Sequence, residues 1–311
     1  MSADTSLINT LYDYTGSDPN LQDPETAHLS IDKNKILGMN AVPGLNIETE
    51  ELDDGIRAHM IVDAGTVIKK PVHLCFGMMA ESGIQRILME VDIKDGAEIS
   101  LLAHCVFPMA VDVQHIMDAN IRIGKNARYS YFEKHVHSPK GGIKVYPKAK
   151  VHIDEKAHFK TEFELIKGRV GLIDIDYESY CAAESVLEMI TRISGQADDL
   201  IKIKESGYLQ GHHARGVLTS KIAVRDQARA EVHNTLVAEA EYARGHVDCK
   251  EIIQDQGVAT AIPIVEVKHP RAHVTHEAAI GSVDNKQLET LMARGLNEDD
   301  AVDLIINGML S

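Results

Sequence analysis

The sequence predicts a mainly β protein built as a parallel β-helix, a solenoid of stacked strands, with short helical regions at both ends. Three observations support this: apolar and polar residues alternate through the middle of the chain, a short motif recurs there at constant spacing, and helical spacing returns near the C-terminus. Alternation is typical of strands with one buried face. One repeat unit cannot bury its own apolar face, so stacked units explain the repeat.

The repeat has the form apolar, polar, apolar, three turn residues and alanine. It begins at Val91, Ile121 and Val151, and a looser copy begins at Ile222. This form fits a strand, a tight turn and the start of the next strand. Taken alone, the repeat leaves one alternative open, an antiparallel sandwich with regularly spaced hairpins.

The chain divides into three regions. Residues 1–45 are polar and expected to be helical, with a helix that starts at residues 4–6 and is stopped at residues 17–20 by Ser-Asp-Pro-Asn. Residues 46–283 form the predicted β-helix core. Residues 284–311 return to helical spacing and form a predicted partner-docking region.

Composition narrows the function classes. The 311 residues carry a net charge of −15, which argues against a general binder of nucleic acid or of anionic membranes. No apolar stretch approaches the roughly 20 residues that span a bilayer. The four cysteines form no CxxC pair and the N-terminus has no apolar signal region, so a reduced, cytoplasmic location is expected. Walker, GxSxG and HExxH motifs are absent from the sequence.

Two groups of residues are candidates for metal chemistry. Cys75, Cys105 and His135 follow one another at the spacing of the repeat, so a solenoid would stack them into a ladder able to hold a soft metal or an iron–sulfur fragment. The alternative is ordinary core packing, because free cysteine is among the most buried residue types.

The second group is the histidine-rich segment 268–277. On a strand, His273 and Glu277 share one face and His276 lies on the other, with Cys249 upstream. Imidazole, carboxylate and thiolate are suitable ligands for iron or zinc, and His276 could also shuttle protons. A polar strand end would accommodate the same residues without any ligand.

The C-terminal region, in particular, resembles the SufB/SufD family, the core scaffold subunits of the SUF iron–sulfur cluster assembly system. Residues 274–308 contain the family's HEAT-like box at His276 and Glu277, its QL pair, an ARG triplet where members have SRG, and an acid-capped helix that ends in glycine. Residues 213–222 and 263–267 resemble the family's upstream strand motifs. The match is specific over 205–308 and weaker before it, and the short chain is similar to compact archaeal members.

The resemblance implies a right-handed parallel β-helix and a scaffold without a catalytic nucleotide site of its own. It implies a SufC-like ABC ATPase docked on the C-terminal helices. It also implies a homodimer or paralogue heterodimer paired through the C-terminal strands, with a transient iron–sulfur cluster at that interface. Recipient apo-proteins are possible further partners, and flavin binding is left open. The candidate cluster residues are Cys249, His276, Glu277 and His273, and the candidate docking residues are Leu288, Leu291, Leu304 and Ile305.

One departure from the family pattern keeps two alternatives open. Gly257 stands six residues before Pro263, where SufB-like members have a cysteine. The chain is therefore either a cluster-binding scaffold that uses Cys249 or a SufD-like structural subunit without a cluster. An unrelated metal-dependent β-helix or cupin-like enzyme is a third interpretation.

Overall fold

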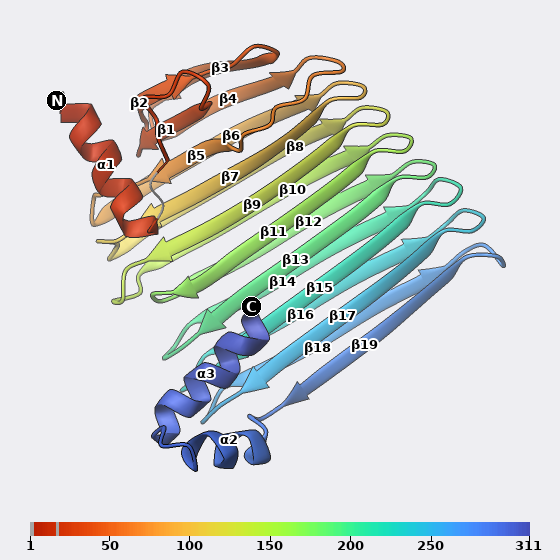
Figure 1. The fold of residues 1–311 in the computed structure, drawn as a ribbon. Coiled ribbons are helices and arrows are strands. Elements are labelled where there is room, and N and C mark those ends of the chain that lie inside the picture. Colours follow the sequence, from red (N-terminus) through yellow and green to blue (C-terminus); the bar gives the residue numbers. More distant parts are fainter. Residues whose placement is uncertain (1–2, 17–18) are drawn as a thin grey trace.

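The computed structural model describes residues 3–16 and 19–311 and shows a flattened parallel β-helix (Figure 1). Within these residues the chain forms two facing sheets of ten and nine strands. The antiparallel strand pairs at residues 28–40 and 45–62 begin the two sheets, and after these pairs successive strands alternate between the sheets. Neighbouring strands along most of each sheet pair in parallel, which confirms the solenoid and excludes the antiparallel sandwich.

The ten-stranded sheet contains, in spatial order, β2 (Lys35–Asn40), β1 (His28–Asp32), β5 (Val72–Gly77), β7 (Glu98–Phe107), β9 (Arg128–His137), β11 (His158–Lys167), β13 (Val186–Gly195), β15 (Arg215–Val224), β17 (Arg244–Ile253) and β19 (His273–Gly281). The nine-stranded sheet contains, in spatial order, β3 (Leu45–Leu52), β4 (Gly55–Val62), β6 (Ser82–Ile93), β8 (Asp112–Ile123), β10 (Ile143–Ile153), β12 (Leu172–Cys181), β14 (Leu200–Leu209), β16 (Arg229–Ala238) and β18 (Val258–Val267). The helices are α1 (Ala3–Thr15), α2 (Asn285–Met292) and α3 (Glu298–Leu310).

Strand register confirms the sequence repeat. Val91, Ile121 and Val151 lie side by side on β6, β8 and β10, and their side chains are buried between the sheets. The looser copy at Ile222 also lies on a strand, but that strand is β15 of the opposite sheet. Ile222 therefore does not extend the row formed by Val91, Ile121 and Val151, although alternation also buries one face of β15.

The turns after these strands depend on residues in the left-handed conformation. Gly96, Asn126 and Lys156 have φ values of 68°, 58° and 60°, and each precedes an alanine that is buried at the corner of the solenoid. Glycine and asparagine adopt this conformation most readily, whereas lysine does so at some energetic cost. The small alanine then lets the next strand begin close to the core.

The N-terminal region is only partly helical, which corrects the expectation for residues 1–45. Helix α1 packs Leu11 and Tyr12 against Cys75 and Val106 on the outer face of the ten-stranded sheet. Residues 28–40 form β1 and β2 instead of helix. Of the predicted stop at residues 17–20, positions 17 and 18 lie outside the described residues.

The C-terminal helices pack along the side of the solenoid and do not cap its end. Val302, Ile306 and Leu310 of α3 pack on Ala223, which faces outward from β15. The last strand β19 stays exposed along its length, as Figure 1 shows for the blue end of the molecule. Among the described residues, no helix has the length and apolar character needed to cross a membrane.

Several polar side chains are buried inside the solenoid, and Glu205 of β14 is one of them. It is 1% exposed, and its Oε1 accepts a hydrogen bond of 2.6 Å from Thr191 Oγ1. Within the described residues, its Oε2 has no hydrogen-bond partner. Burial raises the pKa of Glu205 from 4.5 to about 7, so the carboxyl group is held in its neutral form in acidic solution.

We predict that Glu205→Gln stabilises the protein in alkaline solution. The folded state binds a proton at Glu205 that the unfolded chain releases near pH 4.5, so the wild type loses stability as pH rises from 4.5 through 7. The neutral amide removes this loss, which amounts to about 3 kcal/mol at pH 8. Urea unfolding at pH 4.5 and pH 8 measures the free energy of unfolding of the wild type and the variant, with the exposed Glu98→Gln as the control. A stability difference between Glu205→Gln and wild type that is the same at both pH values would contradict the explanation.

Candidate functional site at the open end

The open end of the solenoid brings part of the predicted cluster site together. Register pairs Cys249 of β17 with Ala278 of β19, and Val247 with His276. Because Val247 and Cys249 face the interior, His276 projects from the same face of the sheet. Cys249 and His276 therefore lie on adjacent strands and point to the same side.

The structure separates the other two predicted residues from this pair. Glu277 pairs with Asp248 and His273 with Arg244, so both project from the outer face, where they are exposed. On that face Lys250 Nζ bonds Asp248 Oδ2 at 2.8 Å. One chain thus presents thiol and imidazole inward and a carboxylate outward at the same edge.

Cys249 is fully buried in the single chain. Its Sγ accepts a hydrogen bond of 3.7 Å from Asn234 Nδ2, and burial raises the pKa of the thiol. Metal binding needs the thiolate, so Cys249 becomes a ligand only when an ion or a rearrangement compensates for burial.

Glu251 is a residue of this site that the sequence analysis missed. It follows Cys249 by two positions, so it also faces inward, and it is 2% exposed. Within the described residues, neither of its carboxylate oxygens has a hydrogen-bond partner. Burial, together with the charge of Asp248, raises its pKa from 4.5 to about 7. Its alternation with Cys249 was the signal that could have identified it.

Position 257, where the resemblance to the SufB/SufD family leads one to expect a cysteine, is sterically closed. A Cβ atom at Gly257 would lie 2.7 Å from the carbonyl oxygen of Val224, closer than real Cβ atoms come to backbone. A cysteine at this position therefore requires the end of β15 to move. This explains in physical terms why residue 257 is glycine in this chain.

A candidate site inside the N-terminal half

The predicted cysteine ladder is only half formed. Cys105 of β7 lies beside His135 of β9, and both face the interior. Cys75 instead pairs with His104, because the step from β5 to β7 is one residue shorter than the step from β7 to β9. A shift of one residue reverses the face, so Cys75 points outward beneath α1 and does not join the ladder.

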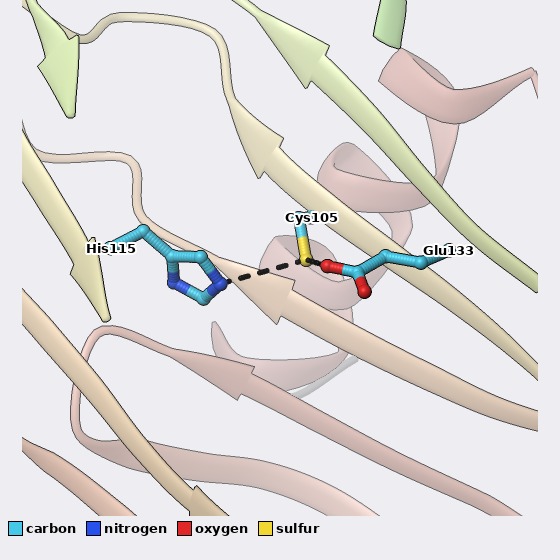
Figure 2. Close-up of side chains that lie close together, drawn as sticks. All are labelled: Cys105, His115 and Glu133. Atoms are coloured by element: carbon cyan, nitrogen blue, oxygen red, sulfur yellow. Dashed lines mark hydrogen bonds between the residues drawn. The ribbon is translucent and has the colours of Figure 1, made fainter. Parts of the chain in front are cut away.

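Two residues that the sequence analysis missed complete a different cluster. His115 of β8 faces Cys105 across the core, and Glu133 lies two residues before His135 on β9 (Figure 2). Cys105 Sγ lies 3.7 Å from His115 Nε2 and 3.5 Å from Glu133 Oε1. One ligand atom from each of the three side chains lies within 4.8 Å of the others. The alternation Glu133-x-His135-x-His137 was the available sequence signal.

A chain of hydrogen bonds fixes the protonation of the neighbouring histidines. His137 Nδ1 lies 3.0 Å from the carbonyl oxygen of Arg169, which can only accept, so this nitrogen donates. His137 Nε2 then accepts from His135 Nδ1 at 3.0 Å. The third bond joins His135 Nε2 to Glu133 Oε1 at 2.7 Å.

The groups at both ends of this hydrogen-bond chain have lowered pKa values. Burial by itself raises the pKa of Glu133, but the hydrogen bond and the charge of His135 outweigh it, so the pKa lies below its usual value. Burial, assisted by the charge of His135, keeps the pKa of His137 well below 6.5. His137 is therefore neutral, and its Nε2 accepts the hydrogen bond from His135.

The C-terminal groove and the family

A groove between α2 and α3 contains the predicted docking residues Leu291, Leu304 and Ile305 and has a volume of about 530 Å³. Leu304 is 51% exposed. The fourth predicted residue, Leu288, packs against the cluster that attaches α3 to the ten-stranded sheet. The groove is therefore a firmly attached surface with apolar side chains open to solvent.

Comparison with known proteins identifies the family. A family model described as the SufBD core domain of SUF system FeS cluster assembly matches residues 75–309. The chain belongs to the SufBD family. An iron–sulfur cluster assembly SufBD family protein of Methanocaldococcus jannaschii is 39% identical over 280 residues, which cover 90% of this chain and 89% of the relative. One from Pyrococcus horikoshii is 32% identical over 300 residues, covering 96% of this chain and 91% of the relative.

The similarity to a relative named SufB covers a shorter stretch of the chain. The iron–sulfur cluster assembly protein SufB of Bacillus subtilis is 33% identical over 72 residues, which cover 23% of this chain and 16% of the relative. The predicted membership of the SufB/SufD family is thus confirmed. This protein thus belongs to a family of iron–sulfur cluster assembly proteins and has the predicted fold, a parallel β-helix.

We predict that Gly257→Ala destabilises this SufBD family protein by about 1–3 kcal/mol, because the added methyl group meets the Val224 carbonyl. Urea unfolding measures the change. Gly281→Ala is the matched control, since a Cβ at Gly281 meets nothing within 4 Å. Equal stability of the two variants would show that the contact at Gly257 is relieved without cost.

Proposed function

We propose that the chain is a scaffold on which an iron–sulfur cluster is assembled where two solenoid ends meet, powered by a SufC-type ABC ATPase. Family membership supports the assembly role. The observation that carries the rest is that Cys249, Glu251 and His276 all lie on the inner face of the last two strands of one sheet, at an uncapped end. Thiolate, imidazole and carboxylate together form a donor set suited to iron.

Pairing of two subunits through β18 and β19 follows from the way the solenoid ends. Both strands are edge strands, and most of their residues are exposed or half-buried. An edge strand leaves backbone donors and acceptors free to pair with another chain. A two-fold axis at this end brings the residues of both copies together, and a homodimer is the simplest arrangement.

The groove between α2 and α3 is the proposed ATPase-docking surface. Leu291, Leu304 and Ile305 offer apolar contacts at its centre, and Asp284 and Lys286 offer charges around them. Because α3 is attached to β15 through Ala223 and through the Arg225–Asp303 ion pair of 2.7 Å, a movement of the helices is transmitted to the sheet. Such a movement is a means of exposing the buried Cys249.

A structural, SufD-like subunit is the second candidate. Two observations favour it: Gly257 leaves no space for a cysteine, and Cys249 is buried. Such a subunit would bind the ATPase and a paralogue without holding a cluster of its own. The two candidates therefore share the docking groove and differ in the role of Cys249.

We predict that Cys249→Ser combined with His276→Ala removes most of the iron that the scaffold acquires on anaerobic reconstitution. The complex with the ATPase is supplied with ferrous iron and sulfide, and visible absorption and iron content are measured. Cys181→Ser is the matched control, because Cys181 is equally buried but lies on β12, away from the open end. Unchanged iron in the double variant would favour the SufD-like subunit.

We also predict that Leu304→Asp abolishes binding of the SufC-type ATPase, because it places a charge in the apolar groove. Its effect on the free energy of unfolding stays within about 0.5 kcal/mol, since Leu304 is half exposed. Co-purification and urea unfolding are the measurements. Val67→Asp, at a 55% exposed site near the other end, is the control. Undiminished binding by Leu304→Asp would place docking elsewhere.

A further inference from the structure

We propose that Cys105, His115 and Glu133 form a resident site for one divalent transition-metal ion, Zn²⁺ or Fe²⁺, inside the solenoid. This site is separate from the proposed cluster site. Strands β11, β13 and β15 lie between β9 and β17, which places the two sites about 19 Å apart at the usual strand spacing of about 4.8 Å. The proposal does not depend on the proposed function.

The distances between donor atoms fit a tetrahedral ion. With metal–sulfur and metal–nitrogen bonds of about 2.3 and 2.05 Å, a tetrahedral angle separates the sulfur and nitrogen ligands by about 3.6 Å. The observed separations are 3.7 Å from Cys105 Sγ to His115 Nε2 and 3.5 Å from Cys105 Sγ to Glu133 Oε1. Both separations from Cys105 Sγ thus match a tetrahedral ion, and one ligand atom from each of the three side chains lies within 4.8 Å of the others.

The charges of the ligands also favour a cation. Cys105 as thiolate and Glu133 as carboxylate together contribute two negative charges, which attract a divalent cation in a fully buried environment. His115 supplies an imidazole nitrogen, Nε2, which lies 3.7 Å from Cys105 Sγ. When the ion binds, the thiol of Cys105 releases its proton, whose place the metal takes.

The surroundings hold these side chains in place. His135 donates to Glu133 Oε1, the oxygen that lies 3.5 Å from Cys105 Sγ, and thereby orients the carboxylate toward the thiol. Phe107 packs against His115 with 5.0 Å between ring centroids, and Phe163 against His135 with 4.7 Å. Carboxylates oriented by a second hydrogen bond and enclosed by apolar rings are typical of protein metal sites.

The choice of ion follows from the donor types. One thiolate and one imidazole disfavour Mg²⁺ and Ca²⁺, which prefer oxygen ligands, and favour Zn²⁺ or Fe²⁺. Because the ligands are buried, the ion enters as the chain folds rather than through the finished core. The protein for the test is therefore produced in cells grown with added zinc or, separately, with added iron.

Metal analysis of the full-length protein after dialysis against a chelator tests the proposal. We expect about one equivalent of metal, and X-ray absorption at the metal edge should show one sulfur ligand at about 2.3 Å with the remainder nitrogen or oxygen. Absence of metal, or a bound metal without a sulfur ligand, would overturn the proposal. This measurement on the wild type does not depend on the folding of any variant.

Variants then assign the ligands. Cys105→Ser should lose the sulfur signal, and Glu133→Gln, which keeps the shape of the side chain, should lower metal affinity at least tenfold. Cys181→Ser and Cys249→Ser should retain the metal, and Cys249→Ser separates this site from the proposed cluster site. Retention of the sulfur signal in Cys105→Ser, or its loss in Cys249→Ser, would refute the assignment.

Discussion

The parallel register between successive turns is the constraint on which the rest of the structure depends. Each turn contributes one strand to each sheet, and register decides which residues of different turns become neighbours. A difference of one residue between turns reverses a side chain from the core to the surface. Cys75 and Cys105 show this directly: they stand one repeat spacing apart in the sequence, yet one lies beneath α1 and the other inside the core.

The same constraint explains why polar groups survive in the interior. Side chains on adjacent rungs are close enough to satisfy one another, so a buried polar residue can find a hydrogen-bond partner on its own or the next turn. Two glutamates show this in different ways. The pKa of Glu133 is lowered because its carboxylate forms a hydrogen bond of 2.7 Å with His135. Glu205, bonded by the hydroxyl of Thr191, is held neutral at acidic pH.

Much of the fold was predictable because its signals are local. Alternation and the repeat at Val91, Ile121 and Val151 identified the stacked strands, and the motif at His276 identified the family. The strands at residues 28–40 were missed because they carry no repeat. Glu251 and His115 were missed because their importance comes from the neighbours that register gives them. The packing of α3 along the sheet, instead of over its end, depends on tertiary contacts that spacing does not reveal.

The two proposed sites differ in access, and this difference agrees with the different roles proposed for them. Cys105, His115 and Glu133 are closed in on all sides by the core, so an ion held there exchanges only when the rungs open and behaves as part of the fold. His276 is exposed at an edge strand, and Cys249 lies directly beneath the last turn. A cargo that must be built and released needs such an edge. The interior site therefore suits a resident ion, and the open end suits a transient cluster.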